Sequence, residues 1–310
     1  MTGFKSRFAA VGMAALIGSF VGSGLTSASP LQGSQVVVST PDDPSQVAIE
    51  GRMIQGGWAM IHLPPYSQLE WGQRQWQADS QGRALIGFSR DQASPVKVRV
   101  TLPNQASFDV AIDLTAKDYL IQRIDGLPQR FVTPDPEALK RIRQDAALAR
   151  AAREKMLDRT DFLTDFIWPT EGIVTGVWGS QRILNGEPRR PHFGIDIANE
   201  TGTPILAPAA GKVTLVANME LSGGTVFVDH GYGLRSDFLH LEEILVELGD
   251  VVEQGQVIAT MGATGRATGP HLHWGMSWMD IRVDPEEVFE LPRRLQRGDQ
   301  IIGNKAKFID

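Results

Sequence analysis

The chain has 310 residues, a formal net charge of −6 and no cysteine. This length suffices for about two domains of ordinary size, each with its own hydrophobic core. Without cysteine the protein forms no disulfides, thiol nucleophiles or thiolate metal sites and carries no lipid on an N-terminal cysteine, so any metal must be held by nitrogen and oxygen ligands. The acidic charge and the lack of a basic tract in the folded part argue against nucleic acid as a partner.

Residues 1–28 have the features of an export signal. Lys5 and Arg7 precede an apolar run from Phe8 to about Leu25, and small residues at its end offer a cleavage site. An uncleaved membrane anchor is the alternative, although several glycines make the run marginal against the roughly 20 apolar residues of a membrane span. Loss of this segment would change the net charge to −8, because it carries two basic and no acidic residues. In either case we expect the rest of the chain to lie outside the cytoplasm.

Residues 35–118 have the pattern of a small β-sandwich of immunoglobulin-like type. Apolar residues alternate with period two in Val96–Leu102 and again in Phe108–Leu114, and Gly, Pro, Asn and Asp separate the short β-prone runs. His62 is the only histidine of this region and is interpreted as a packing or surface residue. The region offers no catalytic constellation.

A connecting helix is predicted over residues 134–160. Asp135 followed by Pro136 is a typical helix start, because proline is favoured at the first helical position. The next 20 or so residues are rich in Ala, Leu, Arg, Lys and Glu and contain neither Gly nor Pro. Residues 165–290 are again β-prone and form a second domain, and residues 291–310 form a C-terminal tail. The predicted fold class is therefore mainly β.

The segment His192-Phe-Gly-Ile-Asp196 is the first candidate for chemistry. On a strand, His192 and Asp196 lie on one face with Gly194 between them, while Phe193 and Ile195 point into the core. An imidazole and a carboxylate on one face, separated by a residue without a side chain, leave room for a metal ion. This spacing alone is weak evidence, since such a pair is common by chance.

Further histidines follow in two β-prone segments. His271 and His273 share a face on either side of Leu272, and such a pair suits zinc, which accepts imidazole nitrogen at about 2.0–2.1 Å. His240 lies beside apolar residues at a strand end, where a buried structural histidine is the alternative. His230 is interpreted as a turn residue outside the site.

One aspartate and four histidines together fit a zinc hydrolase. Such enzymes keep three protein ligands and one position open to water, whose pKa the metal lowers toward about 7. Two histidines beyond a set of three ligands would then serve proton transfer and stabilise the tetrahedral intermediate.

Three motifs in this order, HFGID (192–196), FLHL (238–241) and GPHLHW (269–274), resemble the zinc peptidases of the lysostaphin/LytM family. The resemblance extends from about residue 169 to 285 and departs mildly at Trp178, where phenylalanine is usual. It implies a compact antiparallel β fold with one zinc ion per chain in a groove. The implied zinc ligands are His192, Asp196 and His273, and the implied catalytic residues are His240 and His271.

The resemblance also implies a substrate, namely the stem peptides of bacterial peptidoglycan. We expect an endopeptidase that cuts the D-alanyl–diaminopimelate cross-link, with glycine-rich bridges as the alternative, and a periplasmic location. Arg182, Arg189, Arg190 and Arg266 lie in segments around the expected groove, where their guanidinium groups would bind carboxylates of the substrate. A regulatory protein partner that binds the N-terminal β domain or the helix is a further hypothesis.

Three other functions fit the sequence less well. Some relatives have lost zinc ligands and activate cell-wall amidases instead, whereas this chain keeps all five residues. Residues 246–258 resemble the hairpin of lipoyl and biotinyl carriers, but no lysine lies between Lys212 and Lys305 to carry the cofactor. A serine hydrolase lacks a nucleophile motif here.

Overall fold

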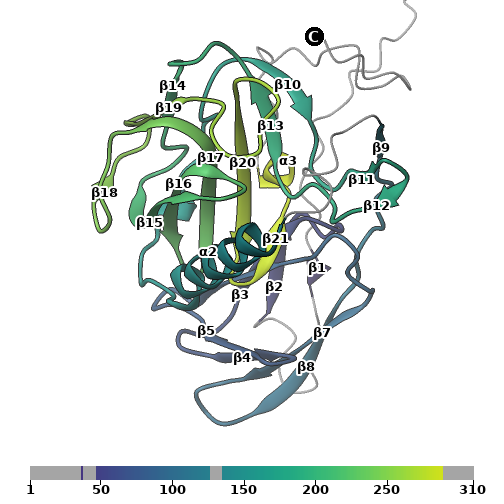
Figure 1. Ribbon diagram of the computed structural model, residues 1–310. Coiled ribbons are helices and arrows are strands. Elements are labelled where there is room, and N and C mark those ends of the chain that lie inside the picture. The colour runs from purple at the N-terminus through teal and green to yellow at the C-terminus, as the bar shows by residue number, and fades with distance from the viewer. Residues whose placement is uncertain (1–35, 38–46, 126–134, 289–310) are drawn as a thin grey trace, which may run out of the picture. The chain divides into compact units, whose positions relative to one another are not determined.

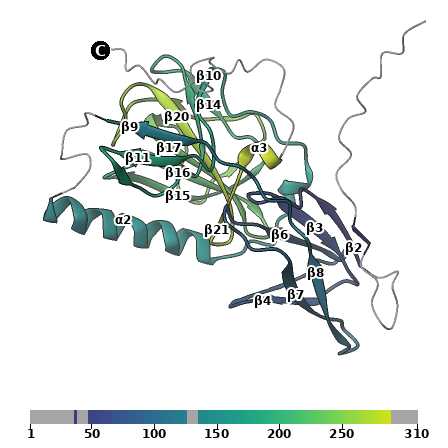
Figure 2. The same ribbon diagram turned by 90° about the vertical axis from the view of Figure 1, so that its right-hand side faces the viewer.

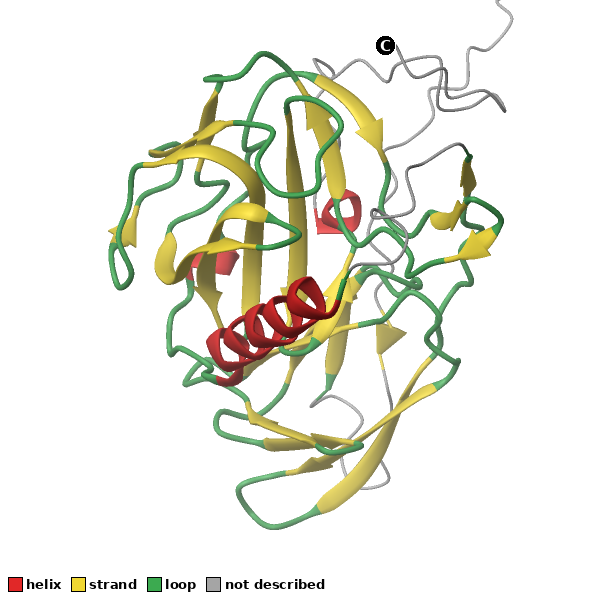
Figure 3. Ribbon diagram, in the orientation of Figure 1, coloured by secondary structure: helices red, strands yellow, loops and turns green. Residues whose placement is uncertain are grey.

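The computed structural model describes residues 36–37, 47–125 and 135–288, which belong to one compact unit (Figure 1). The predicted export signal (1–28) and tail (291–310) lie outside these residues. Strands dominate the described chain (Figure 3), which confirms the mainly β fold class. Within the described ranges, no helix combines the length and the apolar character needed to cross a bilayer.

Two four-stranded antiparallel sheets form the N-terminal region. In β7, Val96, Val98 and Val100 are buried while Lys97 and Arg99 are exposed, because alternate side chains of a strand point to opposite faces. The first sheet has the order β1 (Val36–Val37), β2 (Ala48–Gly51), β3 (Trp58–His62), β6 (Arg83–Gly87). The second has the order β5 (Arg74–Gln77), β4 (Gln68–Trp71), β7 (Val96–Thr101), β8 (Ser107–Ile112).

Helix α2 (Pro136–Glu154) begins at the predicted residues and ends earlier than predicted. The Asp135 side chain caps it by accepting from the amide of Ala138 at 2.8 Å. Beyond the helix, the carbonyl oxygen of Lys155 accepts from Arg235 at 2.5 Å and that of Leu157 accepts from the amide of Tyr232 at 2.9 Å. These residues therefore hydrogen-bond to the following sheet instead of forming another helical turn.

A sheet of ten strands makes up most of the C-terminal region. Its main path has the order β10 (Ile173–Gly176), β13 (Ile195–Ala198), β20 (His271–Trp278), β17 (Leu234–Ile244), β16 (Gly223–Gly231), β15 (Gly211–Met219), β18 (Val251–Val252). Off this path lie β14 (Pro204–Leu206), β19 (Val257–Met261) and β21 (Ile281–Val283). The 3-10 helix η1 (Asp161–Leu163) precedes the sheet and α3 (Pro285–Val288) follows it.

The two faces of this sheet differ in character. Along β20, Leu272, Trp274, Met276 and Trp278 are fully buried in the core. The alternate residues of the strand, which include both histidines, lie on the opposite face. We call this second face the site face.

A small parallel ladder connects the two regions. β9 (Ile121–Ile124), which follows the N-terminal sheets, pairs in parallel with β11 (Gln181–Leu184), and β12 (Glu187–Pro188) completes this three-stranded sheet. The N-terminal region thereby reaches the segment that leads into His192.

Candidate metal centre

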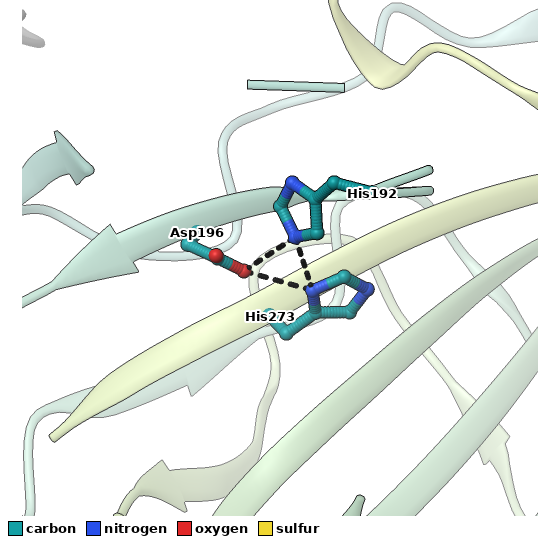
Figure 4. A group of neighbouring side chains, drawn as sticks. All are labelled: His192, Asp196 and His273. Carbon is teal, nitrogen blue, oxygen red and sulfur yellow. Dashed lines mark hydrogen bonds and ion pairs between the residues drawn. The ribbon is translucent and has the colours of Figure 1, made fainter. Parts of the chain in front are cut away.

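Two paired strands bring Asp196 and His273 together. β13 and β20 are antiparallel, and Asp196 lies directly opposite His273, so both side chains project from the site face. His192 lies in the loop before β13, not on the strand as the sequence pattern predicted, and reaches the same point (Figure 4). The three residues offer ligand atoms that all lie within 4.8 Å of one another.

The distances between these atoms suit a small divalent metal ion. His192 Nε2 lies 2.9 Å from Asp196 Oδ1 and 3.0 Å from His273 Nδ1, and His273 Nδ1 lies 2.8 Å from the same carboxylate oxygen. Ligands at about 2.0–2.1 Å from a tetrahedral zinc ion are themselves roughly 3.3 Å apart. Two imidazoles and one carboxylate form a common set for catalytic zinc. The residues therefore fit zinc.

Neighbouring groups orient each of the three ligands. His192 Nδ1 donates to the carbonyl oxygen of Val177 at 3.1 Å, which leaves Nε2 for the metal. Arg182 donates to Asp196 Oδ2 at 3.2 Å and leaves Oδ1 facing the histidines. A Cβ at Gly194 would overlap the His273 ring, so glycine is required there for close approach.

The loop that carries His192 is held by hydrogen bonds and aromatic packing. The amide of His192 donates to the carbonyl oxygen of Ser180 at 2.9 Å. Next to it, the buried Trp178 ring packs on Phe193 and on Tyr119, with ring centroids 5.8 Å apart in both pairs. Tyr119 belongs to the segment before β9, so the N-terminal region contributes to this support.

His240 and His271 lie beside the candidate ligands. Their ring centroids are 4.7 Å apart, and His271 Nε2 lies 4.0 Å from Asp196 Oδ1. His240 Nδ1 donates to the carbonyl oxygen of Thr264 at 2.8 Å, and His271 Nδ1 donates to that of Gly269 at 2.9 Å. Because a carbonyl oxygen only accepts, the neutral form of each ring carries its proton on Nδ1 and has a free lone pair on Nε2.

His240 lies within β17, not at a strand end as predicted, and a register shift of this strand sets its position. Its φ is 65°, in the left-handed region, and the register of β16 and β17 shifts between the pairs at Phe238 and Leu241. The His240 amide leaves the ladder and donates to the carbonyl oxygen of Ser222 at 2.8 Å. Such conformations are costly for residues other than glycine and concentrate at functional sites.

Burial and neighbouring charges shift the pKa values of His240, His273 and Asp196. Burial, with help from His271, lowers the pKa of His240 to about 4. Burial also lowers the pKa of His273, although Asp196 opposes the shift. Burial alone would raise the pKa of Asp196, but His192 and His273 hold it well below its ordinary value. Neutral imidazoles and an ionised carboxylate are the forms that bind a metal.

The four arginines expected around the site divide into two groups. Burial and the guanidinium groups of Arg182 and Arg189 lower the pKa of Arg266, so these three gather on one side. Burial and Arg282 lower the pKa of Arg190, which thus faces a different neighbour.

His62 lies on β3 in the N-terminal region, where its Nε2 is 2.7 Å from Glu50 Oε1.

Sequence patterns did not predict the ion pairs between residues that lie far apart in the sequence. Arg153 of α2 donates to Asp237 Oδ2 of β17 at 2.6 Å, and Arg282 of β21 donates to the same oxygen. The period-two alternation places Asp237 and Leu239 on one face of a strand, but it gives no signal for the partners of Asp237.

His230, interpreted from sequence as a turn residue, instead lies buried in β16, where backbone and side-chain hydrogen bonds occupy both ring nitrogens.

Comparisons with known proteins agree with this geometry. Residues 190–285 match the family described as Peptidase family M23, and this range contains all five histidine and aspartate positions. The peptidoglycan DD-endopeptidase ShyB of Vibrio cholerae is 43% identical over 94 residues, which cover 30% of this chain and 22% of ShyB. The DD-carboxypeptidase/endopeptidase Mpg of Neisseria meningitidis is 40% identical over 119 residues, which cover 38% of this chain and 26% of Mpg. The chain thus spans about a quarter of these curated relatives.

A solved structure shows similarity over a longer stretch. It is a protein of Pseudomonas aeruginosa that is described as a peptidase M23. Its sequence is 32% identical to this chain, and the two structures superpose with a TM-score of 0.61. The match covers 76% of this chain and 95% of that chain. The similarity therefore extends well beyond residues 190–285.

Proposed function

Because the chain belongs to peptidase family M23, we propose that it is a zinc-dependent endopeptidase that hydrolyses peptide bonds in bacterial peptidoglycan. The observation that carries the proposal is the convergence of His192, Asp196 and His273 within 4.8 Å, with His240 and His271 beside them. The alternative of an inactive activator of amidases is not favoured, since no member of this set is missing.

In this proposal each residue has a defined role. His192 Nε2, Asp196 Oδ1 and His273 Nδ1 would hold one zinc ion per chain. A bound zinc ion supplies an acidified water molecule and polarises the scissile carbonyl group. His240 and His271 then move protons at Nε2, because Nδ1 of both rings is committed to a backbone carbonyl. A neutral ring takes a proton as water attacks and returns it to the leaving amine.

The proposed bond is the D-alanyl–diaminopimelate cross-link, with glycine-rich bridges as the alternative. Support comes from relatives whose names specify peptidoglycan DD-endopeptidase activity. The test is digestion of purified sacculi of both cross-link types, followed by mass spectrometry of the new termini. Release of glycan ends instead of amine and carboxyl termini would overturn the peptidase proposal.

The cluster of Arg182, Arg189 and Arg266 supports a role in holding an acidic substrate. Three guanidinium groups gathered together repel one another, and a carboxylate would relieve that repulsion. We assign Arg189 and Arg266 to orienting the cross-link, since Arg182 already contacts Asp196.

The place of action and the partners follow from the same proposal. An enzyme that cuts peptidoglycan works outside the cytoplasm, so we propose an exported, periplasmic protein, with an uncleaved anchor as the alternative. A regulatory protein that binds the N-terminal sheets or α2 remains a proposal for a second partner.

A further inference from the structure

Helix α2 lies on the site face of the C-terminal sheet, the face that carries the metal-binding residues. Leu239 lies directly opposite His273 in the β17–β20 ladder, so both side chains project from one face. Leu239 packs with a small apolar cluster of Leu215, Met219 and Phe227, and Ala149 and Ala152 of α2 pack on that same cluster. α2 runs beside β15 (Figure 2). The helix therefore bounds the space above the metal-binding residues on that side.

Polar contacts fix the helix in this place along its length. Asp145 Oδ2 accepts from the amide of Glu220 at 2.7 Å, and Arg141 pairs with the Glu220 carboxylate at 3.6 Å. Near the other end, the Arg153 guanidinium lies 4.3 Å from the centroid of the Phe227 ring and donates to Asp237. The helix is thus a fixed wall.

A cavity of about 210 Å³ lies between this wall and the candidate metal centre. Its lining includes His273 on one side, Phe193 and Phe227, and three arginines, Arg153, Arg190 and Arg282. Drug-sized ligands occupy about 300–1,000 Å³, so this cavity suits a smaller group. Because His273 lines it, a ligand inside lies against the metal-binding residues.

The cavity has an excess of positive charge. Asp237 is the single acidic side chain among its lining residues in the described chain, whereas three arginines line the same cavity. Its Oδ2 accepts from both Arg153 and Arg282, whereas Arg190 lies 5.4 Å from the centroid of the Phe193 ring. Two guanidinium groups thus share one carboxylate, so the lining carries more cationic than anionic side chains.

We propose that this cavity is an anion subsite that takes the free C-terminal carboxylate of a stem peptide, with Arg190 as its main contact. A guanidinium group matches a carboxylate with two parallel hydrogen bonds, and the neighbouring aromatic rings suit the aliphatic part of a small residue. This inference rests on the proposed peptidase function. The side-chain carboxylate of diaminopimelate has the same chemistry, so the test must separate the two sources.

Binding without turnover is the first test. Zinc-loaded protein is titrated with N-acetyl-D-alanyl-D-alanine and with its C-terminal carboxamide. We expect the carboxylate to bind roughly tenfold to a hundredfold more tightly than the carboxamide. Arg190→Ala should bring this ratio close to one, and Arg190→Lys should restore it in part. A ratio that persists in Arg190→Ala would place the carboxylate elsewhere, for example on the zinc ion, and would overturn the subsite.

Arg150→Ala is the matched control. Arg150 lies exposed on α2, the helix that bounds the cavity, but outside the cavity lining, so this variant removes one arginine charge without changing the lining. The carboxylate-to-carboxamide ratio of Arg150→Ala should equal that of the wild type. If Arg150→Ala and Arg190→Ala lowered the affinity ratio equally, the preference for the carboxylate would come from the overall charge of the protein. That result would contradict the subsite.

Turnover of cross-linked muropeptide dimers is the second test, and it identifies the carboxylate. Amidation of the C-terminal carboxylate should lower kcat/KM of the wild type by about tenfold or more and that of Arg190→Ala far less. Amidation of the diaminopimelate side chain should show no such dependence on Arg190, and the reverse pattern would overturn the C-terminal assignment. If the wild type cleaves no dimer yet binds the carboxylate through Arg190, the proposed function fails while the subsite stands.

Discussion

Arg90 donates through Nε to the carbonyl oxygen of Gly179 at 2.6 Å. The amide of Gly179 in turn donates to the carbonyl oxygen of His192 at 2.7 Å. The Arg90 guanidinium also lies 4.1 Å from the centroid of the Tyr119 ring, whose hydroxyl donates to the Arg90 carbonyl oxygen at 3.1 Å. A residue of the N-terminal region is thus two hydrogen bonds away from a candidate metal ligand.

Replacing Arg90 by Ala should loosen the loop that carries His192. Loss of a partner beyond the metal ligands typically lowers metal affinity by 10- to 100-fold, and we expect about tenfold here. Zinc affinity, measured by competition with a chelator, checks this. Arg90→Lys should not restore the affinity. Lysine lacks the planar guanidinium group that donates to the Gly179 carbonyl oxygen and stacks on the Tyr119 ring at the same time.

Arg99→Ala is the control for this prediction. Arg99 pairs with Asp109 on the exposed surface of the same region. Surface pairs contribute about 0–1 kcal/mol, so this variant should bind zinc as the wild type does. Equal zinc affinity in Arg90→Ala and the wild type would show that the N-terminal region does not position the site.

Removing a metal ligand should abolish zinc binding. In His192→Ala, Asp196→Ala or His273→Ala only two of the three ligand atoms remain, too few for a stable site. Metal analysis of the purified variants tests this, and His62→Ala, which removes a histidine far from the site, should keep one zinc ion per chain. Stoichiometric zinc in Asp196→Ala would contradict the ligand assignment.

His240→Ala and His271→Ala should keep zinc and the fold yet lose activity. Proton transfer by a positioned side chain contributes about 10²–10⁴-fold, so kcat on sacculi should fall by that factor. Circular dichroism and metal content establish that each variant is folded and loaded. Turnover at the parental rate in both variants would exclude the two-histidine mechanism.

The double variant Arg189→Ala/Arg266→Ala should bind zinc normally and show a raised KM or a lowered kcat/KM on sacculi. The expected cause is the loss of two charge-assisted contacts to substrate carboxylates. The defect should shrink at high salt, because the Debye length falls from about 8 Å at physiological ionic strength to about 3 Å at 1 M. Kinetics unchanged at every salt concentration would make these arginines solvated surface charges.

Acidification should destabilise the protein through His230. This ring is fully buried between the Ala210 carbonyl oxygen and the Ser236 hydroxyl, and burial lowers its pKa to about 4. The unfolded chain has the ordinary value of about 6.5 and binds the proton first, so stability is lost as pH falls from about 6.5 to about 4. The full shift corresponds to about 3 kcal/mol.

Urea unfolding of the zinc-loaded protein between pH 7.5 and 4.5 measures how much His230 contributes to the loss of stability in acid. In His230→Gln the free energy of unfolding should depend less steeply on pH than in the wild type, whatever its value at pH 7.5. His62→Gln, at a half-buried histidine of the N-terminal region, serves as the comparison. Identical slopes in wild type and His230→Gln would show that another group accounts for the acid sensitivity.

Local patterns predicted the elements that depend on local chemistry. The capping pair Asp135 and Pro136 starts α2 as expected, and alternation places His271 and His273 on one face of a strand. The helix end at Glu154 was not predictable. It depends on the Arg235 side chain and the Tyr232 amide, which lie about 75–80 positions later and donate to the backbone carbonyl groups that follow the helix. His230 was misinterpreted for the same reason, since its burial depends on the pairing of neighbouring strands.

Motif order predicted the family, which the comparisons confirm, and it named the residues that the structure brings together. Motifs did not predict what surrounds them. The parallel pairing of β9 with β11 joins segments about 60 residues apart, and the sequence pattern of neither strand predicts this pairing. The cavity arginines Arg153 and Arg282 likewise meet Asp237 only through the fold.

The contact between the two regions limits how this protein can be divided. Lys117 donates to Asp284 at 2.6 Å and to Glu287 at 2.8 Å, and Trp76 packs edge-on against Trp278 with ring centroids 5.1 Å apart. A fragment cut to the family boundaries would keep Asp284, a carboxylate that is 1% exposed, without its counter-ion, and would present a bare tryptophan to water. The stretch that matches the family, residues 190–285, is therefore shorter than the stretch that packs together, and transplanting the metal centre into another protein requires the N-terminal region as well.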